Sequence, residues 1–164
     1  LNIRISNLLL NIYMKILMVC LGNICRSPLA EGILKDKIKN AGLDWEVDSA
    51  GTSGWHSGEQ PDIRSIEVAT KYKIDITNQS SRKVRSVDYE IFDLIYAMDT
   101  QNYNDLISQA REDEKHKIKL ILNEIYPGQN KNVPDPYWDD NGFEKVYKML
   151  DEACDMIVEK IKPH

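Results

Sequence analysis

The sequence predicts an α/β protein built on a four-stranded parallel sheet with helices on both of its faces. Short apolar runs alternate along the chain with stretches in which apolar residues recur at helical spacing, the pattern of strands joined by crossover helices. The first apolar run is continuous instead of alternating with polar residues, as expected for a strand buried on both faces. The length of 164 residues favours one domain of ordinary size.

The elements follow one another in a regular order. Four strands are expected, at residues 15–20, 45–50, 92–98 and 118–122. Helices are expected from Pro28 to just before Gly42, from Pro61 to about Tyr72, briefly within residues 86–91, over residues 100–111 and over residues 142–161. Ser27 suits the N-cap of the first helix and Pro28 its first position. Residues 129–138 carry two prolines and are expected to form a loop.

The composition narrows the class of protein. Lys and Arg are interleaved with Asp and Glu and the net charge is −5, so nothing indicates binding to nucleic acid. No apolar stretch approaches the length needed to span a membrane. The three cysteines, Cys20, Cys25 and Cys154, form no even framework of the kind found in disulfide-linked secreted proteins. We therefore expect a cytoplasmic protein.

The N-terminal residues stand apart from this pattern. The first methionine is Met14, directly before the first expected strand. The apolar block at residues 8–10 is too short for the core of a secretory signal. We interpret residues 1–13 as an extension that is not part of the fold, and residues 14–164 as a single domain that naturally starts at Met14.

The turn between the first strand and the first helix carries the strongest functional signal. It reads Cys20-Leu21-Gly22-Asn23-Ile24-Cys25-Arg26-Ser27. Gly22 and Asn23 tolerate positive φ, which lets the backbone curl with its N–H groups pointing inward as an anion-binding nest. The helix N-terminus adds its positive dipole end, and the planar guanidinium of Arg26 suits two phosphate oxygens at once. The sequence therefore predicts a phosphate-binding loop after the first strand.

The same positive surroundings favour the thiolate form of Cys20, which is the nucleophilic form. Ser27 is placed to donate a hydrogen bond to this sulfur. A lone cysteine at the end of a buried strand is usually only a packed side chain. The residues that follow Cys20 at fixed spacings favour a nucleophile instead. A nucleotide-binding loop is not indicated, because the chain has neither Gly-Lys-Ser/Thr nor G-x-G-x-x-G at this turn.

This turn closely resembles the phosphate loop of the low-molecular-weight protein tyrosine phosphatases, and four further segments of the chain resemble the same family. After the loop, Leu29-Ala30-Glu31-Gly32 continues the family's pattern, and residues 48–55 resemble its second strand and specificity loop. Ala97-Met98-Asp99 is similar to the end of the family's third strand, and Asp135-Pro136-Tyr137-Trp138 is similar to its general-acid loop. The similarity covers about residues 15–161.

This resemblance implies hydrolysis of phosphotyrosine in two steps through a phosphocysteine, with no metal or other cofactor. Cys20 would attack phosphorus, Arg26 would clamp the phosphate, and Asp135 would act as general acid and then as general base. The loop residues implied in substrate binding are Leu21, Gly22, Asn23, Ile24, Cys25 and Ser27. An aspartate before a proline indicates by itself only a turn, so the role of Asp135 depends on the resemblance.

The resemblance also implies supporting residues outside the loop. Ser49 would hydrogen-bond to Asn23 and hold the loop in shape. Asp99 would help to orient Arg26, although it suits equally well the N-cap of the helix that follows it. Some family members have a histidine after the second helix that supports the loop, and Tyr72 is the nearest equivalent here.

The walls of the site and its selectivity are implied in the same way. Trp55, Tyr137 and Trp138 would line a slot that is too deep for phosphoserine, the alternative being that they pack in the core. Ile24 favours phosphotyrosine, because a related branch that acts on phosphoarginine carries threonine at this position. Cys25 would form a reversible disulfide with Cys20, or else is a packed side chain.

Two other functions are weighed against the phosphatase. An arsenate reductase shares this fold and loop but needs further cysteines beyond the third strand, and residues 84–110 contain none. A phosphotyrosine-binding module without turnover would not need Cys20, Arg26 and Asp135 together. The expected partners are phosphotyrosine-containing proteins, with a tyrosine kinase as one candidate, and the expected state is a monomer or a weak dimer.

Overall fold

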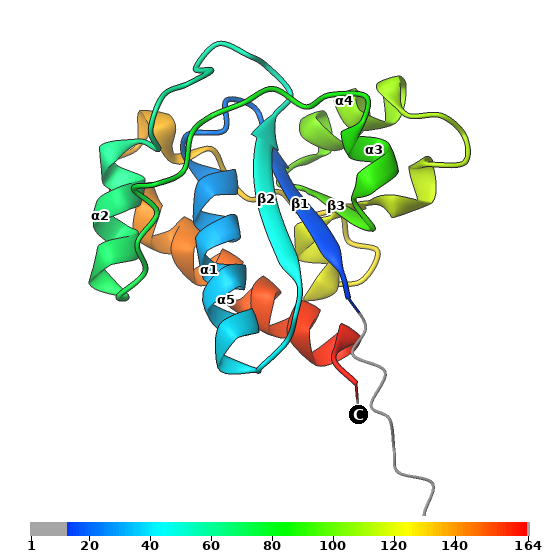
Figure 1. The fold of residues 1–164 in the computed structure, drawn as a ribbon. Helices are drawn as coiled ribbons and strands as arrows, with labels where there is room; N and C mark the ends of the chain where they lie inside the picture. The colour runs from blue at the N-terminus through cyan, green and yellow to red at the C-terminus, as the bar shows by residue number, and fades with distance from the viewer. Residues whose placement is uncertain (1–12, 164) are drawn as a thin grey trace, which may run out of the picture.

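The computed structural model describes residues 13–163 and centres on a sheet of four parallel strands. The strands are β1 (Lys15–Cys20), β2 (Glu46–Gly51), β3 (Leu94–Ala97) and β4 (Ile118–Leu120). They lie in the order β2-β1-β3-β4, so β1 is paired on both sides (Figure 1). The predicted N-terminal extension, residues 1–13, lies outside the described residues except for Tyr13.

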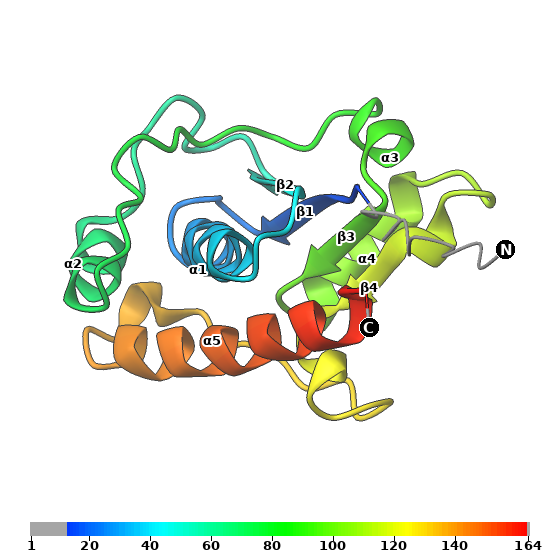
Figure 2. The same ribbon diagram turned by 60° about the horizontal axis from the view of Figure 1, so that its bottom comes forward.

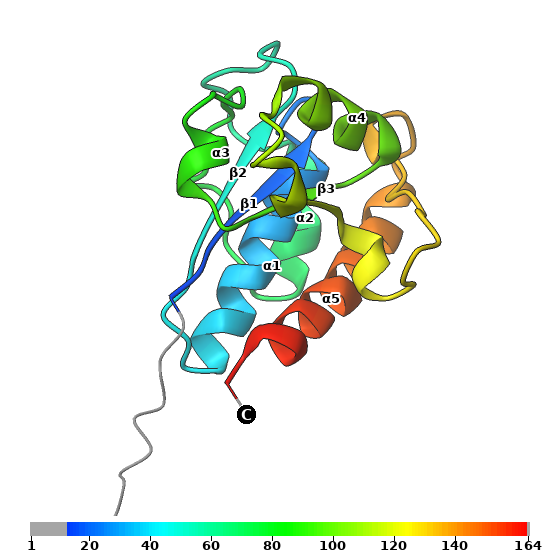
Figure 3. The ribbon, with the colours of Figure 1, turned by 90° about the vertical axis from the view of Figure 1, so that its right-hand side faces the viewer.

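Helices cover both faces of this sheet, which confirms the predicted fold class. The α-helices are α1 (Arg26–Asn40), α2 (Ile63–Lys71), α3 (Asp88–Ile91), α4 (Thr100–Gln109) and α5 (Gly142–Ile161). Three short 3₁₀-helices are η1 (Lys115–Lys117), η2 (Ile121–Glu124) and η3 (Pro136–Trp138). Helices α1, α2 and α5 lie on one face (Figures 1 and 2), and α3 and α4 lie on the other, toward the viewer in Figure 3. Within residues 13–163, no helix is both long and apolar enough to cross a membrane.

The central strand β1 contributes side chains to the hydrophobic clusters on both faces of the sheet, as its continuous apolar sequence predicted. Because side chains alternate across a strand, Ile16 and Met18 join the cluster beneath α1 and α5, while Leu17 and Val19 join the cluster beneath α3 and α4. All four side chains are fully buried. Burial on both faces fixes the register of β1, and therefore fixes where Cys20, its last residue, emerges at the edge of the sheet.

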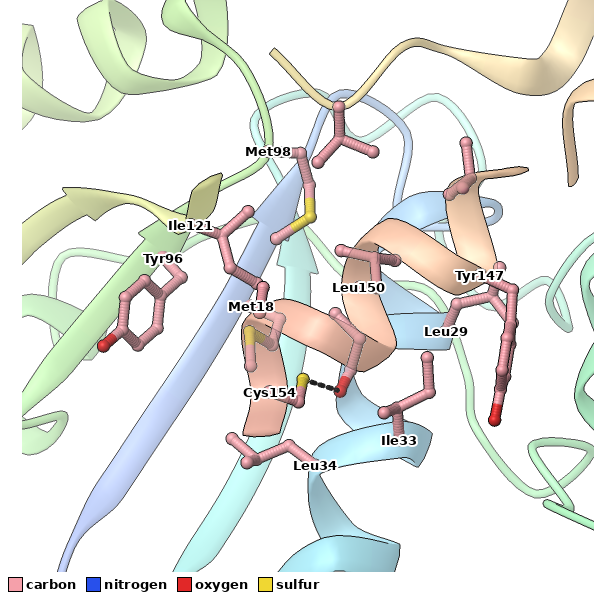
Figure 4. Close-up of a cluster of buried hydrophobic side chains, with 14 of the residues drawn as sticks. Met18, Leu29, Ile33, Leu34, Tyr96, Met98, Ile121, Tyr147, Leu150 and Cys154 are labelled. Atoms are coloured by element: carbon pink, nitrogen blue, oxygen red, sulfur yellow. Dashed lines mark hydrogen bonds between the residues drawn. The ribbon is translucent and has the colours of Figure 1, made fainter. Parts of the chain in front are cut away.

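Helix α5 packs across α1 and the sheet through a stripe of apolar side chains (Figure 4). Cys154 belongs to this stripe and lies fully buried, with its thiol directed at the carbonyl oxygen of Ala30 on α1. Burial raises the pKa of the Cys154 thiol. This cysteine is therefore a packed side chain of the core, as expected from its place on the apolar side of the helix.

The start of α1 differs from the prediction in an informative way. The helix begins at Arg26 instead of after a Ser27 cap, and its N-cap Cys25 makes no side-chain capping bond. The hydroxyl of Ser27 is turned toward the sulfur of Cys20 instead. At the other end, Gly42 adopts a φ of +66° just past the helix, as its sequence position predicted.

Other boundaries shift by a few residues. Strand β4 ends at Leu120, and Ile121 and Leu122 open η2 while remaining buried, because a short apolar run does not distinguish a strand from a buried turn. Helix α2 begins at Ile63, with Asp62 instead of Pro61 before it, because the Asp62 carboxylate accepts the backbone N–H of Arg64. The predicted loop at residues 129–138 contains η3.

Candidate active site

The turn after β1 forms a tight loop at the carboxyl end of the sheet, where ligands of parallel sheets bind. Asn23 adopts a φ of +54°, the left-handed conformation expected of it. Gly22 does not use positive φ, but a Cβ there would lie 3.0 Å from Cδ2 of His56, so a small residue keeps the loop close to its neighbour. Backbone N–H groups of Thr52 and Ser53 donate to the carbonyls of Cys20 and Leu21 and brace the loop from outside.

The sulfur of Cys20 is the focus of this loop. Its Sγ lies 3.1 Å from Oγ of Ser27 and accepts a hydrogen bond from the backbone N–H of Asn23 at 3.3 Å. Cys20 is 3% exposed, so it sits at the floor of the site and not on its surface. Donors aimed at a sulfur stabilise its thiolate more than its thiol.

A chain of buried hydrogen bonds holds Asn23 and, through it, Ser27. The amide nitrogen of Asn23 donates to Ser27 Oγ at 2.8 Å and to Ser49 Oγ at 2.9 Å. Ser49 in turn donates to Oε1 of Glu31 at 2.7 Å. Because Ser27 Oγ already accepts from Asn23, its own hydrogen is free to point at Cys20.

Glu31 is the member of this network that sequence reasoning missed. It is buried on α1, and its other carboxylate oxygen accepts from Lys35. The sequence does offer a signal for Glu31, because a charged residue stands among the apolar positions on the inner side of the helix. A buried charge needs partners, so its position indicates a network. Tyr72, the nearest equivalent of the family's supporting histidine, does not join this network: its hydroxyl donates to Glu144 and its ring stacks on Tyr147.

Arg26 is buried beside Cys20 and is held from two sides. Its Nη1 donates to Oδ2 of Asp99 at 2.6 Å and to the carbonyl of Val133 at 3.0 Å. Burial alone would lower the pKa of Arg26, but the charges of Cys20 and Asp99 outweigh burial and raise it. Asp99 also caps α4 by accepting from the N–H of Asn102 at 2.7 Å. Asp99 therefore bonds to Arg26 through one carboxylate oxygen and caps α4 through the other.

Asp135 faces the same arginine from the far side of the site. It precedes η3, and its Oδ1 accepts the backbone N–H of Tyr137 at 3.1 Å. Its Oδ2 lies 3.9 Å from Nη2 of Arg26, and its side chain is 41% exposed. Asp135 thus lies at the mouth of the site, within reach of both a bound group and water.

These residues surround a cavity of about 270 Å³. It is lined by Cys20, Leu21, Gly22, Ile24, Cys25, Arg26, Trp55, His56, Asp135, Tyr137 and Trp138. Trp55 and Trp138 are exposed at its rim, so the alternative that they pack in the core is wrong. His56 also lines the cavity. A larger hollow of about 540 Å³ lies along α4 and β4, but it has no cysteine or arginine among its described lining residues.

Cys25 also lies in the wall of the cavity. It is buried, and burial raises the pKa of its thiol. Both cysteines carry free thiols in the structure. The loop therefore contains one cysteine whose sulfur is surrounded by donors and one that is held as a neutral packed thiol.

The fold and the site together define an α/β protein of the phosphatase class, with a cysteine, an arginine and an aspartate gathered around the loop that follows β1. A profile described as low molecular weight phosphotyrosine protein phosphatase matches residues 15–164. The chain belongs to this family.

Individual relatives agree with this placement. A low molecular weight phosphotyrosine protein phosphatase of Drosophila melanogaster is 38% identical, over 85% of this chain and 87% of that protein. A crystal structure of a protein tyrosine phosphatase from Entamoeba histolytica, with Hepes in its active site, is 40% identical with a TM-score of 0.85, covering 90% of this chain and 96% of that one. The Drosophila arginine phosphatase DARP is 34% identical with a TM-score of 0.84, covering 91% and 98%.

Proposed function

We propose that this chain hydrolyses phosphotyrosine in proteins through a phosphocysteine intermediate, with Cys20 as nucleophile, Arg26 as phosphate clamp and Asp135 as general acid and base. The observation that carries the proposal is the sulfur of Cys20, which receives hydrogen bonds from the loop while lying beside a buried arginine. No other arrangement among residues 13–163 combines a cysteine, an anion-binding loop and an open cavity.

In the first step, the Cys20 thiolate attacks phosphorus and the bond from phosphorus to the tyrosine oxygen breaks. Loop N–H groups and the guanidinium of Arg26 hold the three equatorial oxygens as charge redistributes. Asp99 and the Val133 carbonyl fix this guanidinium before the substrate arrives, so little reorganisation is needed. Asp135 gives its proton to the leaving phenol oxygen.

In the second step, Asp135, now a carboxylate, removes a proton from water at the open mouth of the cavity. The water oxygen attacks phosphorus, the bond from sulfur to phosphorus breaks, and inorganic phosphate leaves. The Ser27 hydroxyl, turned toward the sulfur by Asn23, stabilises the departing thiolate. Ser49 supports this step by fixing Asn23.

The depth and lining of the cavity support phosphotyrosine over phosphoserine. Arg26 and Cys20 lie at a buried floor, while Trp55 and Trp138 stand exposed at the rim. A phenyl ring spans that depth and stacks on aromatic walls, whereas the short side chain of phosphoserine does not reach the floor.

Ile24 supports phosphotyrosine over phosphoarginine. It lines the cavity with an aliphatic side chain that has no group to pair with a guanidinium. Solved structures of this fold are titled both as a protein tyrosine phosphatase and as an arginine phosphatase, so the fold alone does not choose the substrate, and we assign part of that choice to Ile24.

The experiment is a panel of phosphotyrosine, phosphoserine and phosphoarginine peptides assayed with a chelator and without added metal. We expect hydrolysis of phosphotyrosine alone. Cys20→Ser should lose turnover while still binding the phosphotyrosine peptide, which shows that it is folded. Turnover that survives Cys20→Ser would rule out the phosphocysteine. Arsenite formation from arsenate, or peptide binding without turnover by the unmodified chain, would instead favour the reductase or the binding module.

A further inference from the structure

Arg64 is an ion-pair centre that lies just outside the cavity and joins the two loops of the site. It is the second residue of α2, and its side chain is 26% exposed. It is absent from the cavity lining, so it makes no direct contribution to binding the phosphate. Its guanidinium nevertheless contacts groups on both sides of the active site.

On the side of the phosphate loop, Arg64 is locked onto Asp62. Its Nε and Nη2 donate to the two carboxylate oxygens of Asp62, each at 2.9 Å, in a bidentate pair. Asp62 is only 11% exposed, and Arg64 lowers the pKa of its carboxyl group. The backbone N–H of Asp62 donates to the carbonyl of Ile24 at 2.8 Å. Arg64 is therefore held in a fixed position relative to the phosphate loop.

The remaining guanidinium nitrogen of Arg64 contacts residues 135–140, which we call the acid loop. Its Nη1 donates to the carbonyl of Tyr137 at 3.0 Å and to Oδ1 of Asp140 at 2.6 Å. Its Cζ lies 4.6 Å from the ring centroid of Phe143 and 5.4 Å from that of Tyr137. One guanidinium thus fixes both ends of the turn that follows Asp135.

Tyr137 passes this restraint to the proposed general acid. Its carbonyl is held by Arg64, and its N–H donates to Oδ1 of Asp135. With its side chain 41% exposed, Asp135 has little packing of its own to hold it. The distance from this carboxyl group to a leaving oxygen depends on where the backbone of η3 sits, and small displacements of reacting groups cost large factors in rate.

We propose that Arg64 is a positioning residue that fixes the acid loop, and with it Asp135, against the phosphate loop. The proposal rests on the role of Asp135 proposed above. A purely structural ion pair at the start of α2 would lower stability when removed, but it would slow all substrates equally. A positioning residue for the general acid has a different signature, because protonation matters more for poorer leaving groups.

The experiment measures kcat/KM for a series of aryl phosphates whose phenols differ in acidity. We expect Arg64→Ala to lower kcat/KM about 10-fold for the least acidic phenol and much less for the most acidic one. Inhibition by inorganic phosphate should stay within about twofold, because the Asp62 backbone contact to the phosphate loop remains. Arg64→Lys keeps the charge but not the fork and should fall in between.

Two further variants sharpen the result. In an Asp135→Asn background, Arg64→Ala should add almost nothing, because both changes act on the same proton transfer. Arg111→Ala is the matched control: it removes an exposed arginine that pairs with Glu90, Asp113 and Glu114, and it should leave the whole series unchanged. If Arg64→Ala does not fold, the same series of aryl phosphates measured with Arg64→Lys and with Asp140→Asn decides the question. The Asp140 side chain is 85% exposed.

The possible failures are distinguishable. A loss in Arg64→Ala that is uniform across the series, or additive with Asp135→Asn, overturns the positioning role alone. Hydrolysis that is unaffected by Asp135→Asn, or that survives Cys20→Ser, overturns the proposed function on which it rests.

Discussion

The two loops that meet at the cavity are built in opposite ways. In the phosphate loop, Asn23, Arg26 and Ser27 are buried, at 2%, 3% and 0% exposed, and each has hydrogen-bond partners. In the acid loop, Asp135 and Trp138 are exposed, and the Asp135 carboxylate accepts one backbone N–H at 3.1 Å and makes a longer contact of 3.9 Å to Arg26. The same active site therefore joins a rigid floor to an open rim.

In the proposed mechanism, the difference follows from what each loop has to do. Stabilising a dianion and the charge that develops on it requires donors that are already in place before the substrate arrives. Giving a proton to a phenol and then taking one from water requires a group that meets the solvent between the two steps. Burying Asp135 as deeply as Arg26 would block the water. The predictions below separate these two requirements.

The largest effect is expected at the floor. Arg26→Lys should lower kcat/KM about 10³-fold, because lysine is a point charge that cannot bind two phosphate oxygens while also bonding to Asp99 and Val133. Inhibition by phosphate should weaken as well. Steady-state kinetics of p-nitrophenyl phosphate hydrolysis measures both quantities. Arg111→Lys, at an exposed arginine that does not line the cavity, is the control.

At the rim, Asp135→Asn should separate proton transfer from binding. We expect kcat/KM to fall about 10²-fold, most strongly for phenols of low acidity, with phosphate inhibition unchanged. Asp113→Asn, at an exposed aspartate that does not line the cavity, controls for the lost charge. A matching loss of phosphate affinity in Asp135→Asn would mean that the rim and the floor are not independent.

The same contrast explains what could be predicted from the sequence. The phosphate loop was predictable because its parts are contiguous, and the positions of Cys20, Arg26 and Ser27 follow from one strand, one turn and one helix. Asp135 lies more than a hundred residues away in the sequence, and an Asp-Pro pair has no distinctive pattern of its own. It was found only through a family resemblance.

What the sequence did not predict depends on tertiary contacts. Glu31 bonds to Ser49 and Arg64 bonds to Tyr137, which are pairs that only the packed fold brings together. The shifted helix start at Arg26 has a cause of the same kind, a contact made only in the folded chain. Ser27 looked like a helix cap because serine is common there, but the loop uses its hydroxyl on the sulfur of Cys20.

An intermediate effect is expected at Ser49, which holds Asn23 of the phosphate loop through a buried hydrogen bond. Ser49→Ala removes the group that links Asn23 to Glu31, leaving a buried amide hydrogen and a buried carboxylate oxygen without that partner. We expect about a 10-fold loss in kcat/KM, a similar loss in phosphate affinity and about 1–3 kcal/mol lower stability. Kinetics and thermal unfolding measure these quantities. Ser108→Ala on α4 should change neither, because its exposed hydroxyl donates only to the Asp105 carbonyl.

The smallest effect is expected in selectivity at Ile24, which lies between the floor and the rim. Its side chain is 9% exposed and lines the cavity. Ile24→Thr gives the wall a hydroxyl that can pair with a guanidinium N–H, and it removes a methyl group from the aryl slot. We expect the ratio of phosphoarginine to phosphotyrosine turnover to rise about fivefold, the size of one net hydrogen bond.

The measurement for Ile24→Thr is competition between matched peptides that carry either modification. Phosphate inhibition should stay constant, because the substitution alters no donor to the phosphate. If that ratio does not move while the variant remains active, then Ile24 does not set the substrate. Discrimination would in that case lie with the aromatic rim, where Trp55 and Trp138 are exposed. Solved structures titled as a protein tyrosine phosphatase and as an arginine phosphatase share this fold, so we expect the side chains that line the slot to choose between the two substrates.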